Sequence, residues 1–279
     1  MCSSDLHPYT AAAPGGWAWT DLPGGVPDAD DTSGAVLALA ALGAADERPA
    51  AGGDVSAAIE AGLGWLADLA NRDGGIPTFC RGWGRLPFDT SCPDITAHFL
   101  RAAAAGGASP TGGSRSARAA SRAARYLADT QRPDGSWLPL WFGDEHHPEQ
   151  ANPTYGTAKV VLATLDPRGA AWLIDAQAAD GGVGAARGLP ASIEETAVAV
   201  EALARVAVES PDAPLRGRAA GAVEAGVRWL VERTAQGKRF DAAPIGLYFA
   251  KLWYSEELYP LAFTVAALER ASTLRRPDR

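Results

Sequence analysis

The sequence predicts an all-α protein, in which repeated helix pairs form an incomplete (α/α)6-type barrel. Alanine and leucine dominate the chain and alternating β-branched residues are scarce, which favours helices over strands. Strongly apolar helical segments alternate with more amphipathic ones. Glycine-containing turns recur after successive amphipathic segments, as is typical of helix-pair arrays. Concentric rings of inner and outer helices fit this alternation, and an open solenoid is the alternative architecture.

The apolar segments are expected to form the inner ring, and most begin near a threonine or another small polar residue. They span Asp31–Leu42, Pro93–Ala103, Gly156–Leu165, Glu194–Leu203 and Tyr259–Leu268. The amphipathic segments, whose last turns often carry an aromatic residue, are expected to form the outer ring. They span Val55–Ala70, Ser114–Thr130, Arg168–Gln177 and Arg216–Ala235. A closed barrel of six pairs needs about twelve helices, so we expect N-terminal sequence to be missing.

Turns of similar sequence connect successive helix pairs at Asn71–Gly75, Gln131–Trp137 and Gln177–Gly182. Each combines the end of an amphipathic helix with glycine, which permits the backbone conformation of a tight turn. Two long loops, Gly75–Cys92 and Trp137–Pro153, interrupt the pattern. Loops at one end of a helical barrel commonly line a binding site, so we expect a binding rim there.

The expected domain organisation is one helical domain over residues 8–271, followed by a tail over residues 272–279. Met1–Leu6 reads like the translated end of a sequencing adapter. Residues 1–7 are therefore interpreted as a non-native or disordered scar.

Composition restricts the partners and the compartment. The formal net charge of −8 argues against nucleic acid as a partner, because phosphate binding requires a basic surface. Cys2, Cys80 and Cys92 form no C-x-x-C pair and no even set, which favours a reducing, cytoplasmic environment. The apolar runs are too short to span a bilayer. Peripheral contact with the inner face of the cell membrane and a homodimer both stay open.

A cluster of acids opens the first apolar helix, with Asp28, Asp30 and Asp31 just before the run Ser33–Leu42. Acidic residues suit the exposed N–H groups at a helix start, so an ordinary capped helix is one interpretation. A cap needs only one carboxylate, and crowded carboxylates raise each other's pKa because they cannot all ionise together. The cluster therefore predicts either a helix cap or an acid catalyst.

Four motifs in this chain resemble those of the squalene–hopene cyclases, in the class II triterpene cyclase family. Pro27–Thr32 is similar to the family's D-x-D-D-T-A acid motif, with Ser33 in place of the alanine. Gln131–Trp137 resembles the QW repeat, Pro93–His98 the D-x-T-A-H segment and Tyr155–Thr157 the Y-G-T segment. The motifs occur in the family's order, and the resemblance covers nearly the whole chain as the C-terminal half of such a cyclase.

The resemblance implies an isomerase of bacterial hopanoid biosynthesis. Such enzymes protonate a terminal alkene of squalene or a similar polyprene and guide carbocation cyclisation to a polycyclic product, with no metal and no cofactor. Because an alkene is a very weak base, the donor must be a strong acid that is still protonated at neutral pH. By resemblance Asp30 is this donor, and Asp28 and Asp31 tune it.

Three further residues are implied to act with the acids. By resemblance His98 hydrogen-bonds the acid cluster, Asp94 orients His98, and Tyr155 joins the water network that reprotonates the donor. Asp94 and His98 are four residues apart and share one helix face, so an ordinary surface pair is the alternative. A core tyrosine with a satisfied hydroxyl is the alternative for Tyr155.

Five aromatic residues resemble positions that line the family's cavity, namely Trp19, Phe79, Trp141, Tyr248 and Tyr254. Aromatic faces stabilise a carbocation through their quadrupoles without offering it a nucleophile. The assignment of Tyr248 and Tyr254 has a register ambiguity of one residue. A packing role is the alternative for each of the five.

Other polar groups are interpreted as structural. His146 and His147 are adjacent, which suits a solvated loop better than a tetrahedral metal site, so no metal is expected. Glu194, Glu195 and Glu201 are expected at a helix cap and at the rim of the fourth apolar helix.

Some features depart from the family pattern and keep rival functions open. Ile76 and Val183 stand where the repeat has tryptophan, and Lys159 lies in an apolar helix near the expected cavity. One rival is a class II cyclase of an isoprenoid diphosphate. The other is a non-catalytic helical-repeat scaffold that binds lipid or protein. By this resemblance, we expect an N-terminal half that would close the cavity to be missing, which leaves the activity of this chain alone open.

Overall fold

The computed structural model describes residues 12–22, 25–45, 55–83, 86–108, 112–248 and 252–275. The chain divides into two compact units, Met1–Thr130 and Gln131–Arg279, and each is described by itself. The expected scar over residues 1–7 and the last residues of the expected tail lie outside the described residues.

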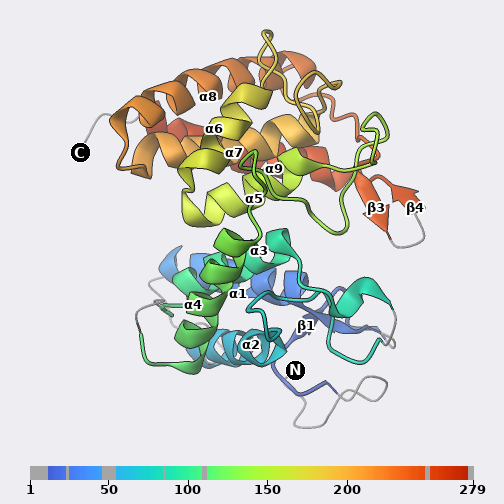
Figure 1. The fold of residues 1–279 in the computed structure, drawn as a ribbon, viewed down its shortest axis with the longest axis vertical. Helices are drawn as coiled ribbons and strands as arrows, with labels where there is room; N and C mark the ends of the chain where they lie inside the picture. The colour runs from blue at the N-terminus through green and yellow to red at the C-terminus, as the bar shows by residue number, and fades with distance from the viewer. Residues whose placement is uncertain are drawn as a thin grey trace. The chain divides into compact units, whose positions relative to one another are not determined.

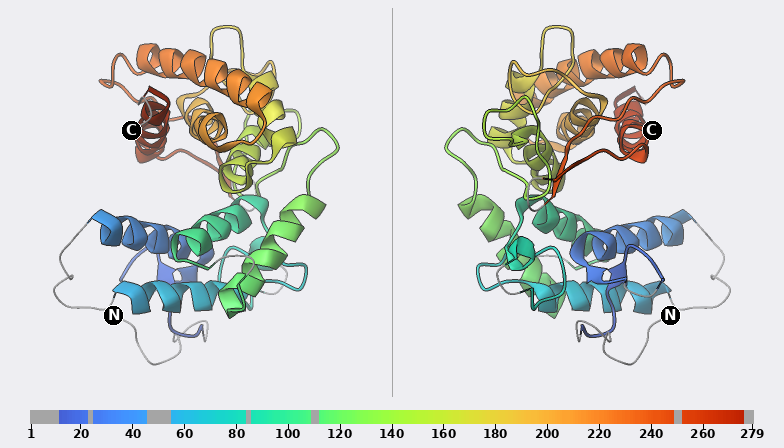
Figure 2. Two further views of the ribbon diagram at one scale, coloured as in Figure 1. Left: turned by 90° about the vertical axis from the view of Figure 1, so that its left-hand side faces the viewer. Right: turned by 90° about the vertical axis from the view of Figure 1, so that its right-hand side faces the viewer.

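Two stacked helix pairs make up the first unit. They are α1 (Ala29–Ala45), α2 (Val55–Leu69), α3 (Pro93–Ala105) and α4 (Arg115–Asp129). Helix α1 packs against both α2 and α3, and α4 packs against both α3 and α2 (Figures 1 and 2). This arrangement places the two apolar helices next to each other and the two amphipathic helices next to each other, as the alternation along the sequence predicts.

Helix α7 is the centre of the second unit. The helices of this unit are α5 (Pro153–Thr164), α6 (Pro167–Ala176), α7 (Ile193–Glu209), α8 (Ala213–Arg233) and α9 (Leu258–Ser272), which continues into the 3-10 turn Thr273–Arg275. Helix α7 packs against α5, α8 and α9, and Figure 1 shows these neighbours around it. Because it is covered on three sides, α7 is buried around most of its circumference, including Ile193, Leu203 and Val206.

The all-α prediction is confirmed, and each of the nine helical segments expected from the sequence corresponds to a helix in the described part of the chain. The sequence did not predict the two short antiparallel hairpins. They pair β1 (Trp17–Ala18) with β2 (Pro27–Asp28), and β3 (Gly246–Tyr248) with β4 (Leu252–Tyr254). Among the described residues, no helix is both long and apolar enough to cross a membrane.

The turns between helix pairs depend on glycine because the backbone is left-handed and space is short. Three turn glycines have φ values of 95°, 97° and 99°. A Cβ atom at each would lie within 3.0 Å of a backbone carbonyl oxygen on the following amphipathic helix. The glycines and the residues whose carbonyls they approach are Gly74 with Arg122, Gly135 with Arg168 and Gly181 with Ala225.

A buried threonine near the start of an apolar helix ties that helix to the segment that precedes it. In each case the threonine Oγ1 accepts a hydrogen bond of 2.9–3.0 Å from a backbone N–H. The acceptors and donors are Thr32 with Trp17, Thr96 with Ile76, Thr157 with Trp137 and Thr196 with Val183. Because the backbone N–H donates, the tie does not need tryptophan after the turn, which explains why Ile76 and Val183 are tolerated there.

Candidate functional site

The acid cluster lies at a strand-to-helix junction in the first unit. Asp28 ends β2, and its neighbours in the sheet are Trp17 on one side and Phe79 on the other. Its Oδ1 accepts a hydrogen bond of 2.7 Å from the N–H of Asp31, so Asp28 caps α1. Its backbone carbonyl accepts a hydrogen bond of 2.6 Å from the hydroxyl of Thr32. One member of the cluster is therefore a helix cap, and the other two carboxylates are left for other contacts.

Burial and crowding together raise the pKa of Asp28 to about 9. The largest cause is burial, which disfavours the ionised form, followed by the side-chain hydrogen bond with Asp31. The charges of Asp31 and Asp30 act in the same direction. Crowding was the cause expected from the sequence, and the structure adds burial as the larger one. Asp28 is consequently a neutral carboxylic acid at pH 7.

Asp30 and His98 are brought together from positions 68 residues apart in the sequence. The imidazole Nδ1 of His98, on α3, lies 2.6 Å from Oδ1 of Asp30, on α1. The Asp30 side chain is 65% exposed and that of His98 is 23% exposed, so the pair is open on the carboxyl side. An accessible carboxyl group held by an imidazole is a suitable arrangement for passing a proton to a bound molecule.

Asp94 is buried at the start of α3, where its Oδ1 accepts a hydrogen bond of 2.6 Å from Sγ of Cys92. The contact with the Cys92 thiol was not predicted from the sequence, which indicated His98 as the partner of Asp94. Cys92 immediately precedes the helix, so its side chain can contact Asp94 in the first turn. Within the described residues, neither Cys80 nor Cys92 forms a disulfide.

Aromatic rings gather beside the acid cluster in the first unit. The rings of Trp19 and Phe79 meet edge to face with centroids 6.0 Å apart. Phe79 also contacts Trp83 and Phe88, at 5.7 Å and 4.9 Å. Because the backbone of Phe79 pairs with Asp28, this group is fixed next to the acids. Trp83 and Phe88 lie in the loop Gly75–Cys92, and their placement depends on the fold of that loop.

A second group of aromatic residues lies in the second unit, where the loop after Trp137 meets the hairpin β3–β4. The rings of Trp141 and Tyr248 are 5.1 Å apart. The carbonyl of Trp141 accepts a hydrogen bond of 2.9 Å from the N–H of Leu247, which fixes the hairpin against the loop. The ring of Tyr254 covers Gly246, where a side chain could not fit.

Tyr155 belongs to an aromatic wall made of Phe142, Tyr155, Tyr259 and Phe263. Phe142 stacks on Tyr155 at 3.7 Å, and Tyr259 stacks on Phe263 at 5.3 Å. The ammonium of Lys159 lies 5.0 Å from the ring centre of Tyr155 and 4.8 Å from that of Phe263. The four-residue spacing within Tyr155/Lys159 and Tyr259/Phe263 is a signal in the sequence that the prediction did not use. Asp28, Asp30 and His98 belong to the first unit and the wall to the second.

A family model for the squalene–hopene cyclase C-terminal domain matches residues 7–273. The chain belongs to this family. Its relatives include an ent-copalyl diphosphate synthase of Streptomyces, 31% identical over 93% of this chain and 48% of that protein. They also include a squalene–hopene cyclase of Alicyclobacillus acidocaldarius, 30% identical over 54% of this chain and 23% of that protein. The chain therefore spans about half the length of the first of these relatives, and less of the second.

Solved structures agree on the fold of this squalene–hopene cyclase family member. A type II terpene cyclase of Scytonema, MstE, in complex with merosterolic acid A, superposes with a TM-score of 0.66 at 19% identity, over 93% of this chain and 76% of that one. An ent-copalyl diphosphate synthase of Streptomyces platensis superposes with a TM-score of 0.57 at 21% identity, over 86% of this chain and 50% of that one. The helix-pair fold is thus that of the class II terpene cyclases.

Two glutamates of this family member were misplaced by the sequence analysis. Glu194 and Glu195, expected at a cap and a rim, are 0% and 1% exposed, while the cap of α7 is Ser192. Burial is the largest cause that raises the pKa of both, and the pKa of Glu195 reaches about 8. Glutamate is common on helix surfaces, so the sequence alone favours exposure. Glu201 is also mostly buried, 3.8 Å from the guanidinium of Arg270.

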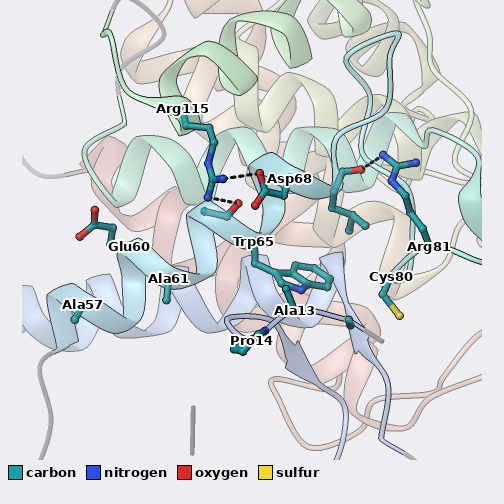
Figure 3. Close-up of a pocket in the computed structure, with 13 residues that line it drawn as sticks. Ala13, Pro14, Ala57, Glu60, Ala61, Trp65, Asp68, Cys80, Arg81 and Arg115 are labelled. Carbon is teal, nitrogen blue, oxygen red and sulfur yellow. Dashed lines mark hydrogen bonds and ion pairs between the residues drawn. The ribbon is translucent and has the colours of Figure 1, made fainter. Parts of the chain in front are cut away.

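A cavity of about 580 Å³ lies elsewhere in the first unit, between α2, α4 and residues 12–14. Figure 3 shows Arg115 joined to Asp68 by a dashed line, with Trp65 nearby on α2. Arg115 and Asp68 form an ion pair of 2.7 Å. Arg81 donates to the carbonyls of Leu69 and Ala70, so both cations are already engaged. The charged groups of Arg115, Asp68 and Arg81 in this cavity therefore already have partners within the protein.

The histidines of the loop are placed as the solvated-loop interpretation suggests. His146 lies 4.0 Å from Glu145, and Nδ1 of His147 accepts a hydrogen bond from the N–H of Glu149. Across the described ranges, no group of three or more His, Cys, Asp or Glu side chains is placed to hold a metal ion.

Proposed function

We propose that this chain is the acid-bearing part of a class II terpene cyclase that protonates a terminal alkene of a squalene-like polyprene. The observation that supports this proposal most is the contact between Asp30 and His98, beside the neutral carboxyl group of Asp28. Family membership supplies the reaction class, because terpene cyclases are isomerase-type enzymes. Squalene as the substrate and the hopene-type product are part of the proposal.

Asp30 is the proton donor in this proposal. Its carboxyl proton adds to one carbon of the terminal alkene and leaves a tertiary carbocation, while the Asp30 carboxylate that remains is stabilised by His98. Neighbouring double bonds then attack the cation in turn, and loss of a proton or capture of water ends the reaction. Asp28 is neutral, so it adds no negative charge that would hold the proton on Asp30. Asp31 is assigned the role of tuning the acidity of Asp30. Asp94 is assigned a supporting role for His98, because both lie on α3.

The aromatic groups protect the carbocation in this proposal. Trp19 and Phe79 stand beside the acids and are assigned to the first cation formed. Trp141 and Tyr248 are assigned to the stabilisation of later cations, and Tyr254 supports the hairpin that carries Tyr248. Tyr155 is assigned to the reprotonation of Asp30. Ring quadrupoles stabilise a nearby cation by roughly 0.5–2 kcal/mol each, with no lone pair to quench it.

The test is to incubate the complete gene product with squalene and to analyse the products by mass spectrometry. Asp30→Asn should lower the rate of cyclisation by about 100-fold or more, because amide nitrogen cannot donate the proton. Asp68→Asn, which removes a surface acid on α2, should cyclise at the wild-type rate. Cyclisation by Asp30→Asn at the wild-type rate contradicts the assignment. Binding of squalene without any product from squalene or a shorter polyprene favours the scaffold alternative.

A prenyl diphosphate is the second candidate substrate, and the position of Lys159 favours it. Its ammonium lies on the aromatic wall, where a hydrocarbon substrate needs no positive charge. The ent-copalyl diphosphate synthase of Streptomyces is also 31% identical to the chain. Lys159→Met should then lower turnover of geranylgeranyl diphosphate at least tenfold and leave turnover of squalene unaffected. Equal effects on both substrates would exclude a diphosphate-binding role.

A further inference from the structure

We propose that Glu194 and Glu195, at the start of α7, are positioning residues that hold together the two backbone segments carrying Trp141, Phe142 and Tyr248. The aromatic groups matter for catalysis only under the proposed function, but the positioning itself is a property of the fold. The first of the two segments, Trp141–Asn152, is called the aromatic loop below, and the second, Asp241–Tyr248, is called the strap.

Glu194 fixes the strap. Its Oε1 accepts a hydrogen bond of 2.7 Å from the N–H of Ala243, which lies just before β3. The segment before β3 has no regular secondary structure, and this bond ties it to the buried first turn of α7. The strap leads directly into β3, which carries Tyr248.

Glu195 fixes the aromatic loop through Asn152. Its Oε1 accepts a hydrogen bond of 2.9 Å from Nδ2 of Asn152, and the same nitrogen donates to the carbonyl of Gly143 at 3.2 Å. The amide oxygen of Asn152 accepts from the N–H of Tyr155 at 3.0 Å and so caps α5. Asn152, held by Glu195, therefore fixes the position of the loop after Phe142. It also fixes the first turn of α5, which carries Tyr155.

Two backbone hydrogen bonds join the loop to the strap and close the network. The N–H of Gly143 donates to the carbonyl of Ile245 at 2.8 Å, and the N–H of Leu247 donates to the carbonyl of Trp141 at 2.9 Å. Each glutamate of α7 accepts one hydrogen bond from one of the two segments. The two backbone hydrogen bonds then join the segments to each other. Adjacent residues Trp141 and Phe142 consequently stay in contact with Tyr248 and Tyr155, respectively.

Burial favours the neutral form of Glu195 in this network. Among the described residues, Oε2 of Glu194 and of Glu195 has no hydrogen-bond partner, and an unpartnered neutral oxygen costs much less than a buried carboxylate. The pKa of Glu195 is raised to about 8 by burial first and then by the charges of Glu194 and Asp144, while its hydrogen bond with Asn152 acts in the opposite direction. Ionisation of Glu195 should therefore loosen the loop and the strap.

Amide hydrogen exchange of the complete chain, followed by mass spectrometry between pH 5 and pH 9, tests the proposal without a substrate. When the loop opens, Glu195 regains its ordinary pKa of 4.5. After correction for the intrinsic exchange rate, protection of peptides from the loop and the strap should fall up to about tenfold per pH unit up to pH 8. It should change little between pH 5 and pH 9 in the double variant Glu194→Gln/Glu195→Gln, which keeps both acceptors and cannot ionise.

Variants with and without the acceptor separate positioning from simple packing. Glu195→Leu keeps the volume but loses the acceptor, so loop protection at pH 6 should fall about tenfold. Glu195→Gln should retain it. Glu201→Gln changes another largely buried glutamate on α7, about two turns further along the helix and beside Arg270, and should match the wild type at every pH. Equal protection in Glu195→Leu and Glu195→Gln, or a wild-type profile that does not vary with pH, would overturn the proposal.

Turnover provides a separate measurement. If the chain cyclises squalene or a prenyl diphosphate, Glu195→Leu should give products with fewer rings, because the displaced aromatic residues protect the cation less well, and Glu195→Gln should give the wild-type product. If the wild-type protein cyclises neither compound, the proposed function fails while the exchange experiment still decides whether the glutamates position the loop and the strap.

Discussion

Asp28 shows how a residue can be structural and chemical at once. Its Oδ1 caps α1, which is the ordinary role of aspartate at a helix start, and its burial makes it a neutral acid beside Asp30. The two interpretations drawn from the sequence thus apply to different members of one cluster, the cap to Asp28 and the accessible acid to Asp30. His98 gives Asp30 its partner, and only the packing of α3 on α1 brings them together.

Replacing Asp28 by asparagine should remove part of the pH dependence of stability. The pKa of Asp28 is raised from 3.8 to about 9, so the folded state binds the proton more tightly than the unfolded state, and stability falls as pH rises between these values. Asp28→Asn keeps an oxygen for the cap and carries no charge. Its melting temperature should exceed that of the wild type at pH 8, and the difference should vanish near pH 4. Thermal unfolding followed by circular dichroism measures it, and a difference that does not vary with pH would show that Asp28 is ionised in the folded protein.

At the scale of elements, the repeat is held by backbone contacts more than by its characteristic side chains. In each turn a glycine with left-handed backbone lies against a carbonyl of the next amphipathic helix. A threonine of the apolar helix accepts a hydrogen bond from a backbone N–H after the turn. The same chemistry therefore recurs in turns whose side chains differ, such as those at Ile76 and Trp137. This explains why the helix pairs keep their stacking although two of the repeats lack tryptophan.

Two glycine-to-alanine variants should change stability in opposite directions. Gly135 has φ of 97° and lies against the carbonyl of Arg168, so Gly135→Ala should lower the free energy of unfolding by about 1–3 kcal/mol. Gly221 lies within α8 with open space around it, so Gly221→Ala should raise it by about 0.5–1 kcal/mol. Urea unfolding of both variants checks the pair, and a loss of stability in both would contradict the explanation.

The threonine tie can be tested with an isosteric change. Thr157→Val leaves the volume intact but removes the acceptor for the buried N–H of Trp137, and should cost about 1–3 kcal/mol. Thr164→Val, near the end of the same helix, removes a hydroxyl that donates to the carbonyl of Val160 and accepts only a longer, exposed hydrogen bond of 3.3 Å from the N–H of Asp166, and should cost less than about 1 kcal/mol. Similar losses in the two variants, measured by chemical unfolding, would show that the tie adds nothing.

At the scale of the whole molecule, the chain is a squalene–hopene cyclase C-terminal domain whose described residues form two units. The second unit has a hydrophobic core to which α5, α6, α7, α8 and α9 all contribute. The acids belong to the first unit and the aromatic wall to the second. The cyclase function proposed here therefore assigns roles to residues of both units.

The second unit, Gln131–Arg279, should fold when it is produced alone, because every residue of its core cluster comes from within it. It should show helical circular dichroism and one cooperative thermal transition. Production of this piece and of the complete chain in parallel provides the comparison. A helical but non-cooperative piece that binds hydrophobic dyes would mean that its core depends on the first unit.

The sequence alone determined the helices, their apolar and amphipathic classes and the family, because helical periodicity and local motifs depend on neighbouring residues. Glycine and threonine at fixed places in each repeat likewise show where the pairs join. Only the tertiary structure decided which groups meet: Asp30 with His98, Asp94 with Cys92, and Phe142 with Tyr155. It also decided that Glu194 and Glu195 are buried, since a residue's solvent exposure depends on segments far away in the chain. Burial and long-range contact set the charge of each acid, and the sequence by itself contains neither in readable form.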